Sequence, residues 1–436
     1  MTPPPVRVAA YSSTAVFAAA GCVEMWCLQE NEVWNHVLSL PTSLDLAEDE
    51  IVPSAFGTQV SVNQGVMAVS ASVRSKVTGK VAPAVALYVG ISRKEWVLAE
   101  VIKCDAAPCL HTPQPCSTPG AFASPNESPT GCLGGGFGSS VAVHDQLLAV
   151  GIPNNSSVAV YKQRSTGVDS ATLGKRLHVG VGLIWQFQMM LREPDETPDG
   201  TKHSAFGSAI ALSSNVIVVG HPASGDPTGG ALIFSALPGG TGAARFGEIL
   251  LDVRQECCIL ELPCCHSVYA GRSVDEMELA DTARIIVGDP SNDAAVLVDC
   301  DLLQMKDGFM SDSPKSAVCA ISDYVTAAKS YSKARTHGST PKVDGRGWGA
   351  SVALGGEMVF FGNPSWSCTD GGKSGQCGQV CYAASCPPEY CLLYDFSVDN
   401  HICLSCTDEN ACKGGMEVSV LVSLDASFHS SPLPSS

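Results

Sequence analysis

The feature that most constrains the fold of this chain is a pattern that recurs along it. Each copy opens with an aromatic residue and a glycine, continues through an apolar stretch, a polar turn and a second apolar stretch, and closes with Gly-x-Pro. In three copies the aromatic residue and the closing glycine are 14 positions apart. Equal spacing in separate copies indicates a structural repeat. The marker residues are Phe56, Gly57, Phe137, Gly138, Gly151, Pro153, Phe206, Gly207, Gly220, Pro222, Gly288, Pro290, Trp348, Gly349, Gly362 and Pro364.

Two further copies are degenerate. One opens at Ala270-Gly271 and has a few extra residues near Asp275. The other precedes Phe56 and keeps only its later runs, beginning at Thr14. The copy that opens at Phe56 is regular except that Ser70 stands where the others have glycine.

Each copy contains enough alternating runs for one small sheet. A third run follows Gly-x-Pro, as at Val158 to Tyr161, and a fourth is marked by Trp34, Trp96 and Trp185. A period of two with turn residues between the runs predicts four antiparallel strands per copy. One such sheet cannot bury both faces, so the copies must pack together. We therefore predict an all-β fold, a β-propeller of six four-stranded blades, and a seventh blade would need sequence beyond this chain.

The marker residues themselves have a structural interpretation. A glycine beside a bulky aromatic residue lets backbones approach closely, while the ring fills space between neighbouring sheets. Proline ends a strand because it has no amide hydrogen for the ladder. We therefore interpret both markers as architecture rather than as ligand contacts.

These copies resemble the FG-GAP repeat of integrin alpha-chain propellers, which is named for its Phe-Gly and Gly-Ala-Pro pieces. The segments FGSSVAVHDQLLAVGIP (137–153) and FGSAIALSSNVIVVGHP (206–222) carry the resemblance, which spans about residues 6–365. It implies an extracellular or surface-attached propeller that binds other macromolecules, often in adhesion.

One departure from the integrin pattern concerns calcium. Many integrin repeats have a DxDxDG loop between their first two strands, and Ca²⁺ takes about six to eight oxygen ligands. The equivalent turns here are Asn63-Gln64-Gly65, His144-Asp145-Gln146, Ser213-Ser214-Asn215 and Gly355-Gly356-Glu357, and none has enough carboxylates. The chain therefore resembles a calcium-free branch of the family, and we predict no metal or cofactor site.

The 20 cysteines fall into local groups with even counts, which favours disulfides between neighbours and an oxidising compartment. Zinc is the alternative, but only Cys403 and Cys406 have CxxC spacing, without a second such pair. The disulfide candidates are Cys22 and Cys27; Cys104, Cys109, Cys116 and Cys132; Cys257, Cys258, Cys264 and Cys265; Cys300 and Cys319; and Cys368, Cys377, Cys381, Cys386, Cys391, Cys403, Cys406 and Cys412.

Charge and hydropathy exclude some classes of partner. The formal net charge is −17, from 26 Lys and Arg against 43 Asp and Glu, so we expect no nucleic-acid partner. No apolar run is long enough for a membrane-spanning helix. Asn126, Asn154 and Asn155 lie in Asn-x-Ser triplets and are candidate glycosylation sites of a glycoprotein.

The repeats and cysteine groups together predict the organisation of the chain. We assign residues 6–365 to the propeller, with a Cys-rich insertion at 104–132, and residues 366–414 to a second Cys-rich insertion. Residues 415–425 form a strand that either completes the last blade or pairs with the first, because a propeller must cover its open edges. Residues 426–436 are rich in Ser and Pro, which predicts a loose tail.

No catalytic constellation is present in the sequence. GxSxG, HExxH and a complete phosphate-binding loop are all missing, so we predict a non-enzymatic protein. The predicted function is a secreted or cell-surface module that binds a protein or glycan ligand in adhesion. The alternatives are an accessory propeller of a secreted hydrolase, since some hydrolases carry repeats of this family beside a catalytic domain, and a structural protein of a matrix or wall.

Overall fold

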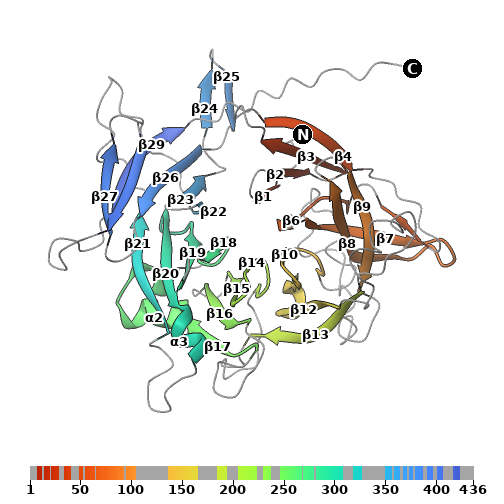
Figure 1. Cartoon of the computed structure of the whole chain (residues 1–436), viewed down its shortest axis with the longest axis horizontal. Helices are drawn as coiled ribbons and strands as arrows, with labels where there is room; N and C mark the ends of the chain where they lie inside the picture. Colours follow the sequence, from red (N-terminus) through yellow and green to blue (C-terminus); the bar gives the residue numbers. More distant parts are fainter. Residues whose placement is uncertain are drawn as a thin grey trace.

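Six antiparallel sheets follow one another along the described part of the chain in a computed structural model (Figure 1). The structure describes residues 7–11, 14–19, 21–28, 34–40, 49–52, 55–63, 65–92, 95–104, 136–164, 184–193, 205–222, 229–236, 246–267, 269–278, 281–307, 318–326, 349–355, 358–363, 367–370, 373–376, 379–385, 390–395, 400–405 and 416–422.

The strands of each sheet are antiparallel and follow chain order. The first sheet contains β1 (Arg7–Tyr11), β2 (Thr14–Ala19), β3 (Cys22–Leu28) and β4 (Trp34–Leu40). The second contains β6 (Val60–Asn63), β7 (Val66–Ser75), β8 (Val81–Ser92) and β9 (Glu95–Lys103), and β5 (Asp49–Ile51) pairs with the end of β7. The third contains β10 (Val141–His144), β11 (Leu147–Ile152), β12 (Ser157–Arg164) and β13 (Ile184–Arg192).

The next two sheets carry the helices. The fourth contains β14 (Ala209–Leu212), β15 (Val216–His221), β16 (Gly230–Ser235) and β17 (Ile249–Asp252). It is followed by α2 (Val253–Ile259) and the 3₁₀ helix η4 (Pro263–His266). The fifth contains β18 (Val274–Glu278), β19 (Thr282–Asp289), β20 (Ala294–Asp301) and β21 (Cys319–Thr326), with α3 (Leu302–Asp307) after β20.

The sixth sheet is interrupted by two hairpins. It contains β22 (Ser351–Gly355), β23 (Met358–Asn363), β26 (Gln379–Ser385) and β29 (Met416–Val422). The strands β24 (Ser367–Asp370) and β25 (Lys373–Gln376) form one hairpin, and β27 (Tyr390–Asp395) and β28 (Asn400–Ser405) form the other. Because β29 pairs with β26, the C-terminal strand completes the last sheet.

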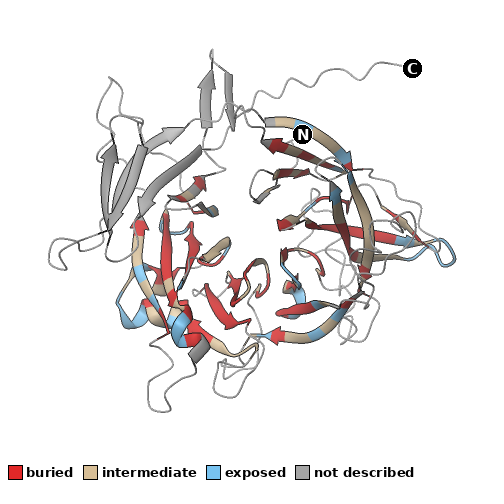
Figure 2. Cartoon of the chain, viewed as in Figure 1, coloured by how far each residue is buried: buried red, intermediate tan, exposed pale blue. Residues whose placement is uncertain are grey.

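The sheets are arranged around a central axis with their first strands innermost (Figure 1). The innermost strands contact one another in the order β1, β6, β10, β14, β18 and β22. This arrangement confirms the predicted β-propeller. Figure 2 shows buried residues on the strands of the described blades.

The hydrophobic core lies between neighbouring blades, as expected for sheets that bury both faces. One cluster joins the first and second sheets around Met25 and Phe56, and another joins the second and third around Leu87 and Phe137. Phe206 packs between the third and fourth sheets. Each opening aromatic residue in these three copies therefore fills the space between two blades.

The glycine that follows the aromatic residue has a backbone conformation that other residues rarely adopt. Its φ lies between 80° and 89° in all five copies, at Gly57, Gly138, Gly207, Gly271 and Gly349. In this conformation the Gly138 amide donates a hydrogen bond to the Gly151 carbonyl over 3.0 Å, and the Gly207 amide does the same to Gly220. The degenerate copy keeps this geometry, because Gly271 donates to Gly288 over 3.0 Å.

The closing glycine is required for a different reason, which is close contact with the next blade. A Cβ atom on Gly220 would lie 2.0 Å from the Gly271 carbonyl oxygen, and one on Gly288 would lie 2.1 Å from the Gly349 carbonyl oxygen. Ser70 occupies this position in the second blade. Gly138, which faces Ser70 across the blade interface, is less crowded than its counterparts, because a Cβ atom on it would first meet the Ala84 carbonyl oxygen at 3.3 Å.

Three disulfide bonds are present among the described residues, which confirms that neighbouring cysteines pair. They join Cys257 to Cys264, Cys258 to Cys265, and Cys300 to Cys319. The last pair lies directly opposite across β20 and β21.

The predicted pairing of Cys22 with Cys27 is wrong, because both are free thiols on the same strand, β3. An odd separation along a strand places side chains on opposite faces, and accordingly Cys22 is exposed whereas Cys27 is buried. Two cysteines so placed cannot bond to each other.

Several other predicted residues have only a partial description. Cys104 is buried after β9, while Cys368, Cys381, Cys391 and Cys403 lie in β24, β26, β27 and β28. The following predictions lie outside the described residues: Trp348, Pro364, Cys109, Cys116, Cys132, Cys377, Cys386, Cys406, Cys412, Asn126 and the tail at 426–436.

Candidate functional site

Side chains of the innermost strands link each blade to the next. Ser61 of β6 accepts a hydrogen bond from the Val143 amide of β10 over 3.0 Å. Asp275 of β18 accepts one from the Leu354 amide of β22 over 2.7 Å. Ser61 and Asp275 each lie five positions after the opening residue of their repeat, so the same contact recurs at two blade interfaces.

A second set of contacts joins the first turns of three consecutive blades. Asn63 Nδ2 lies 3.1 Å from His144 Nδ1, and the Asp145 amide donates to Asn63 Oδ1 over 3.3 Å. Ser214 of the next blade donates from Oγ to Asp145 Oδ2 over 3.1 Å. Asp145 has a left-handed φ of 49°, which Asp tolerates better than most residues. The turns of the second, third and fourth blades are thus fixed relative to one another.

These turns surround a pocket of about 820 Å³, which we call the turn-face pocket. Its polar lining comes from His144, Asp145, Gln146, Lys162, Gln163, Gln188 and Ser214, and its apolar and backbone lining comes from Gly65, Val66, Val89, Gly90, Leu147, Ala236 and Phe246. The lining therefore combines hydrogen-bond donors, acceptors and one aromatic ring. Such a mixture is typical of ligand-binding pockets in proteins.

Equivalent backbone hydrogen bonds hold the walls of the turn-face pocket. The Gly90 amide donates to the Gly65 carbonyl over 2.8 Å, and the Gln163 amide donates to the Gln146 carbonyl over 2.7 Å. The Ala236 amide makes the corresponding bond to Asn215 over 2.8 Å. Each bond ties the end of a third strand to the first turn of its own blade, so the lining residues stand on a rigid framework.

Acidic side chains of β18 lie next to this region. Glu278 Oε1 accepts hydrogen bonds from both the backbone amide and the side-chain amide of Asn215 over 2.8 Å. Loss of hydration raises the pKa of Asp275 to about 6, although its bond from Leu354 opposes the shift. Burial likewise raises the pKa of Glu276 well above its usual range, and its Oε1 atom has no partner among the described residues. Ionisation of Asp275 and Glu276 on this innermost strand is therefore unfavourable compared with ionisation of the same groups in water.

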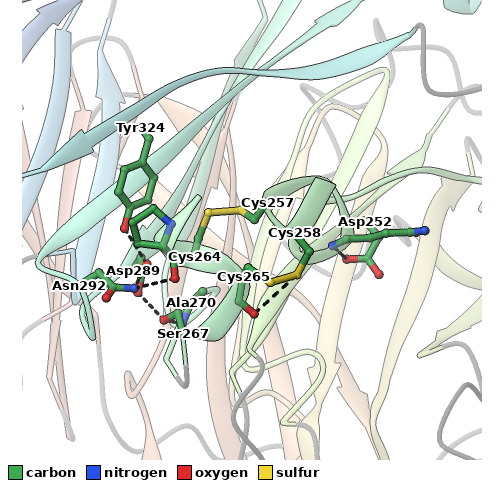
Figure 3. Close-up of a disulfide and its surroundings, with 12 residues drawn as sticks. Asp252, Cys257, Cys258, Cys264, Cys265, Ser267, Ala270, Asp289, Asn292 and Tyr324 are labelled. Atoms are coloured by element: carbon green, nitrogen blue, oxygen red, sulfur yellow. Dashed lines mark hydrogen bonds between the residues drawn. A yellow bond between two sulfur atoms is a disulfide. The ribbon is translucent and has the colours of Figure 1, made fainter. Parts of the chain in front are cut away.

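A second buried carboxylate, that of Asp289, lies at the end of the fifth blade opposite to Glu278 (Figure 3). Asp289, the middle residue of Gly-x-Pro in the fifth blade, accepts hydrogen bonds from Ser267 Oγ, Asn292 Nδ2 and Tyr324 Oη. Three donors satisfy the buried carboxylate, so Asp289 ties η4, β19 and β21 together. Its role is structural.

The sequence interpretation and the site agree only in part. The turns at Asn63, His144 and Ser214 stood out as lacking calcium ligands, and the structure brings them together at one pocket. Lys162, Gln163 and Gln188 were not predicted as site residues, because no local motif marks them. The glycosylation candidates Asn154 and Asn155 are exposed in η3 (Pro153–Asn155), at the other end of β11 from the pocket.

The described residues contain neither a metal-binding cluster nor a membrane-spanning helix. No group of three or more His, Cys, Asp or Glu side chains in them is arranged to hold a metal ion. None of their helices has the length and apolar character needed to cross a membrane.

No protein-family model and no curated protein matches this chain. Among solved structures, it is similar to a protein from Lactobacillus plantarum, with 13% identity over 70% of this chain and 69% of that one and a TM-score of 0.36. A protein of Thermus thermophilus described as a putative oxidoreductase (glucose dehydrogenase) has 11% identity over 85% and 95%, with a TM-score of 0.37. The N-terminal domain of Nup159 has 10% identity over 83% and 73%, with a TM-score of 0.34.

Proposed function

We propose that this chain is an FG-GAP-like propeller of the extracellular space or cell surface that binds a protein or glycan ligand in its turn-face pocket. The observation that carries the proposal is the pocket itself, which three blades build from pre-positioned polar side chains. Its volume of about 820 Å³ lies within the range of about 300–1,000 Å³ that is usual for ligand pockets. The three disulfide bonds support an oxidising compartment.

The chemistry of the lining supports recognition of a polar, hydroxylated or amide-bearing group. Gln163, Gln188 and Gln146 each offer both a donor and an acceptor, while Lys162 adds a charged donor and Asp145 a charged acceptor. Phe246 offers an apolar surface on which a sugar ring or a side chain can pack. A small number of such groups on an otherwise closed surface fixes the orientation of a ligand.

The test is a binding screen of the purified chain on printed glycans and immobilised extracellular proteins, followed by titration of the best ligand. We expect Lys162→Ala and Gln188→Ala each to weaken binding by about tenfold, because each removes a hydrogen bond that a bound ligand would use. Gln255→Ala is the matched control, since Gln255 is exposed on α2 rather than in the pocket. Absence of any ligand, or binding that the pocket variants leave unchanged, would contradict the proposal.

A further inference from the structure

Two disulfide bonds join adjacent cysteines of α2 to adjacent cysteines of η4. Cys257 bonds to Cys264 and Cys258 bonds to Cys265, and each bond spans seven positions (Figure 3). Cys257 and Cys264 are each only 1% exposed and belong to the core between the fourth and fifth blades. Cys258 is exposed and Cys265 is partly exposed. We call these the inner and the outer bond.

The outer bond is not needed to hold this segment in place. In the chain-entropy account, a disulfide bond stabilises the fold by closing a loop, and the inner bond alone closes this one. The outer bond joins the residues next to those of the inner bond, so it restricts the unfolded chain little further. The segment is further held by hydrogen bonds from the Leu262 amide to the Cys257 carbonyl over 2.9 Å and from Gln255 to the Asp252 cap over 3.1 Å.

The surroundings leave the outer bond accessible to a reagent in solution. Ile259 and Leu260, which follow Cys258 directly, are 65% and 46% exposed, so they point into solvent instead of packing over the sulfur atoms. His266, next to Cys265, is also exposed. The inner bond, by contrast, packs among Val253, Val298 and other core residues. Access and thiolate character determine which disulfide exchanges.

We infer that Cys258–Cys265 is a thiol–disulfide exchange site that takes a low-molecular-weight thiol. The thiolate of such a reagent attacks one of the two sulfur atoms. Their bond breaks, a mixed disulfide forms, and the other cysteine leaves as a thiolate that takes a proton from water. A second thiolate then attacks the mixed disulfide. It releases the oxidised small-molecule disulfide and leaves both cysteines reduced, so the two added thiols supply the two electrons.

The experiment uses the native full chain and reduced glutathione as the probe. The protein is incubated at about pH 8, near the ordinary pKa of a thiol, with graded ratios of reduced to oxidised glutathione, quenched with acid and alkylated. Trypsin cleaves after Arg254 and Arg272, so all four cysteines lie in one peptide and fragment ions assign each label. We expect Cys258 and Cys265 to be modified at least about tenfold faster than Cys257, Cys264, Cys300 and Cys319, with the circular dichroism spectrum unchanged.

Two double variants complete the test. Cys258→Ser with Cys265→Ser should stay folded and take up no glutathione within the tryptic peptide 255–272 under these conditions. Cys257→Ser with Cys264→Ser should still be modified at Cys258 and Cys265, and if it does not fold, the assignment on the unmodified chain decides. Simultaneous opening of all three bonds, or earlier opening of the inner bond, would overturn the inference.

Discussion

Gly151 of the third blade lies against the carbonyl oxygen of Gly207 in the fourth, so closely that a Cβ atom on Gly151 would be 2.0 Å from that oxygen. The neighbouring Ser140 donates from Oγ to the same oxygen over 2.6 Å. At the interface of the fifth and sixth blades, Ser273 and Gly288 make the same two approaches to Gly349. The spacing between blades is thus set by backbone contact near the axis.

Replacement of a closing glycine should therefore destabilise the fold. We expect Gly151→Ala and Gly220→Ala each to lower the free energy of unfolding by about 1–3 kcal/mol or more, because the added carbon atom overlaps backbone that cannot move without separating the blades. Urea denaturation gives this value. Ser70→Ala is the matched control at the same repeat position, where a Cβ atom is already present, so it should lose only the hydrogen bonds of its hydroxyl with Thr58 and Gln59, at about 1 kcal/mol for each. A Gly151→Ala variant as stable as the unmodified chain would contradict the argument.

Asp275 and Glu276 should make stability depend on pH in the direction opposite to most carboxylates. Both pKa values are raised in the folded state, that of Asp275 to about 6, so above about pH 4 the folded chain binds more protons at these groups than the unfolded chain. Stability from these groups is therefore present below about pH 4 and is lost as the pH rises. For Asp275 the loss is on the order of 3 kcal/mol.

Variants isolate this contribution. Asp275→Asn keeps an oxygen that can accept the Leu354 amide but cannot ionise, and Glu276→Gln is uncharged in the same way. Urea denaturation from about pH 4 to about pH 7 should show a smaller fall in stability for both than for the unmodified chain. Glu95→Gln, at an exposed site on β9, should leave the profile unchanged. A fall as steep in Asp275→Asn as in the unmodified chain would exclude this source.

Two ion pairs among the described residues join side chains that lie directly opposite each other on neighbouring strands, and they differ mainly in burial. Arg284 and Asp299 lie opposite each other on β19 and β20, with side chains 5% and 15% exposed and Nε to Oδ1 at 2.9 Å. Arg74 and Glu50 lie opposite each other on β7 and β5 at 2.8 Å, but are 49% and 45% exposed. We expect Asp299→Ala to cost about 3–5 kcal/mol, because it removes the carboxylate that accepts two hydrogen bonds from a buried guanidinium, and Glu50→Ala to cost less than about 1 kcal/mol.

A double-mutant cycle at each pair measures the difference in coupling. Replacement of both buried partners, by Arg284→Met with Asp299→Leu, should recover much of the loss seen with Asp299→Ala, since both buried charges are removed. The exposed pair should show coupling of less than about 1 kcal/mol, and less again in high salt. Similar coupling at both pairs would mean that burial does not govern these interactions.

The Cys300–Cys319 bond should contribute more than either short bond on α2. Its two cysteines are buried and lie 19 positions apart, so the bond closes a longer loop. By chain entropy its removal in Cys300→Ala with Cys319→Ala should cost about 3 kcal/mol. Thermal unfolding monitored by calorimetry would show this as a lower midpoint. The matched variant Cys258→Ala with Cys265→Ala should shift the midpoint less, and the reverse order would contradict the loop-length argument.

Much of the fold was predictable because the repeat encodes it locally. Phe137, Gly138 and Gly151 occur within one blade, and each has a requirement that only its residue type meets: a ring between sheets, a positive φ and the absence of a Cβ atom. The degenerate copy at Gly271 was recognisable since it keeps the second of these requirements. Cysteine grouping predicted that the cysteines of α2 and η4 pair within their group, but not which cysteine bonds to which. It failed at Cys22 and Cys27, because the side chains of these two residues lie on opposite faces of one strand.

The turn-face pocket was less accessible to such reasoning. Its lining comes mainly from the first turns and third-strand ends of three blades, with Gln188 added from the fourth strand β13, and Lys162, Gln188 and Ser214 share no motif. Only the curvature of the ring brings them within reach of one ligand. His144 could be recognised as a turn residue, but its contact with Asn63 of another blade depends on inter-blade packing that periodicity does not specify.

The glycine contacts near the axis affect which parts of the chain can change during evolution. Contacts at Gly151, Gly220 and Gly288 set the distance between neighbouring blades near the axis, at the hub of the ring. The connections at the outer edge of the ring therefore do not have to set it. Connections there can lengthen, acquire cysteines and diverge without altering how the ring is assembled. The hairpins β24–β25 and β27–β28, inserted between paired strands of the last blade, are examples of additions that such a hub can carry.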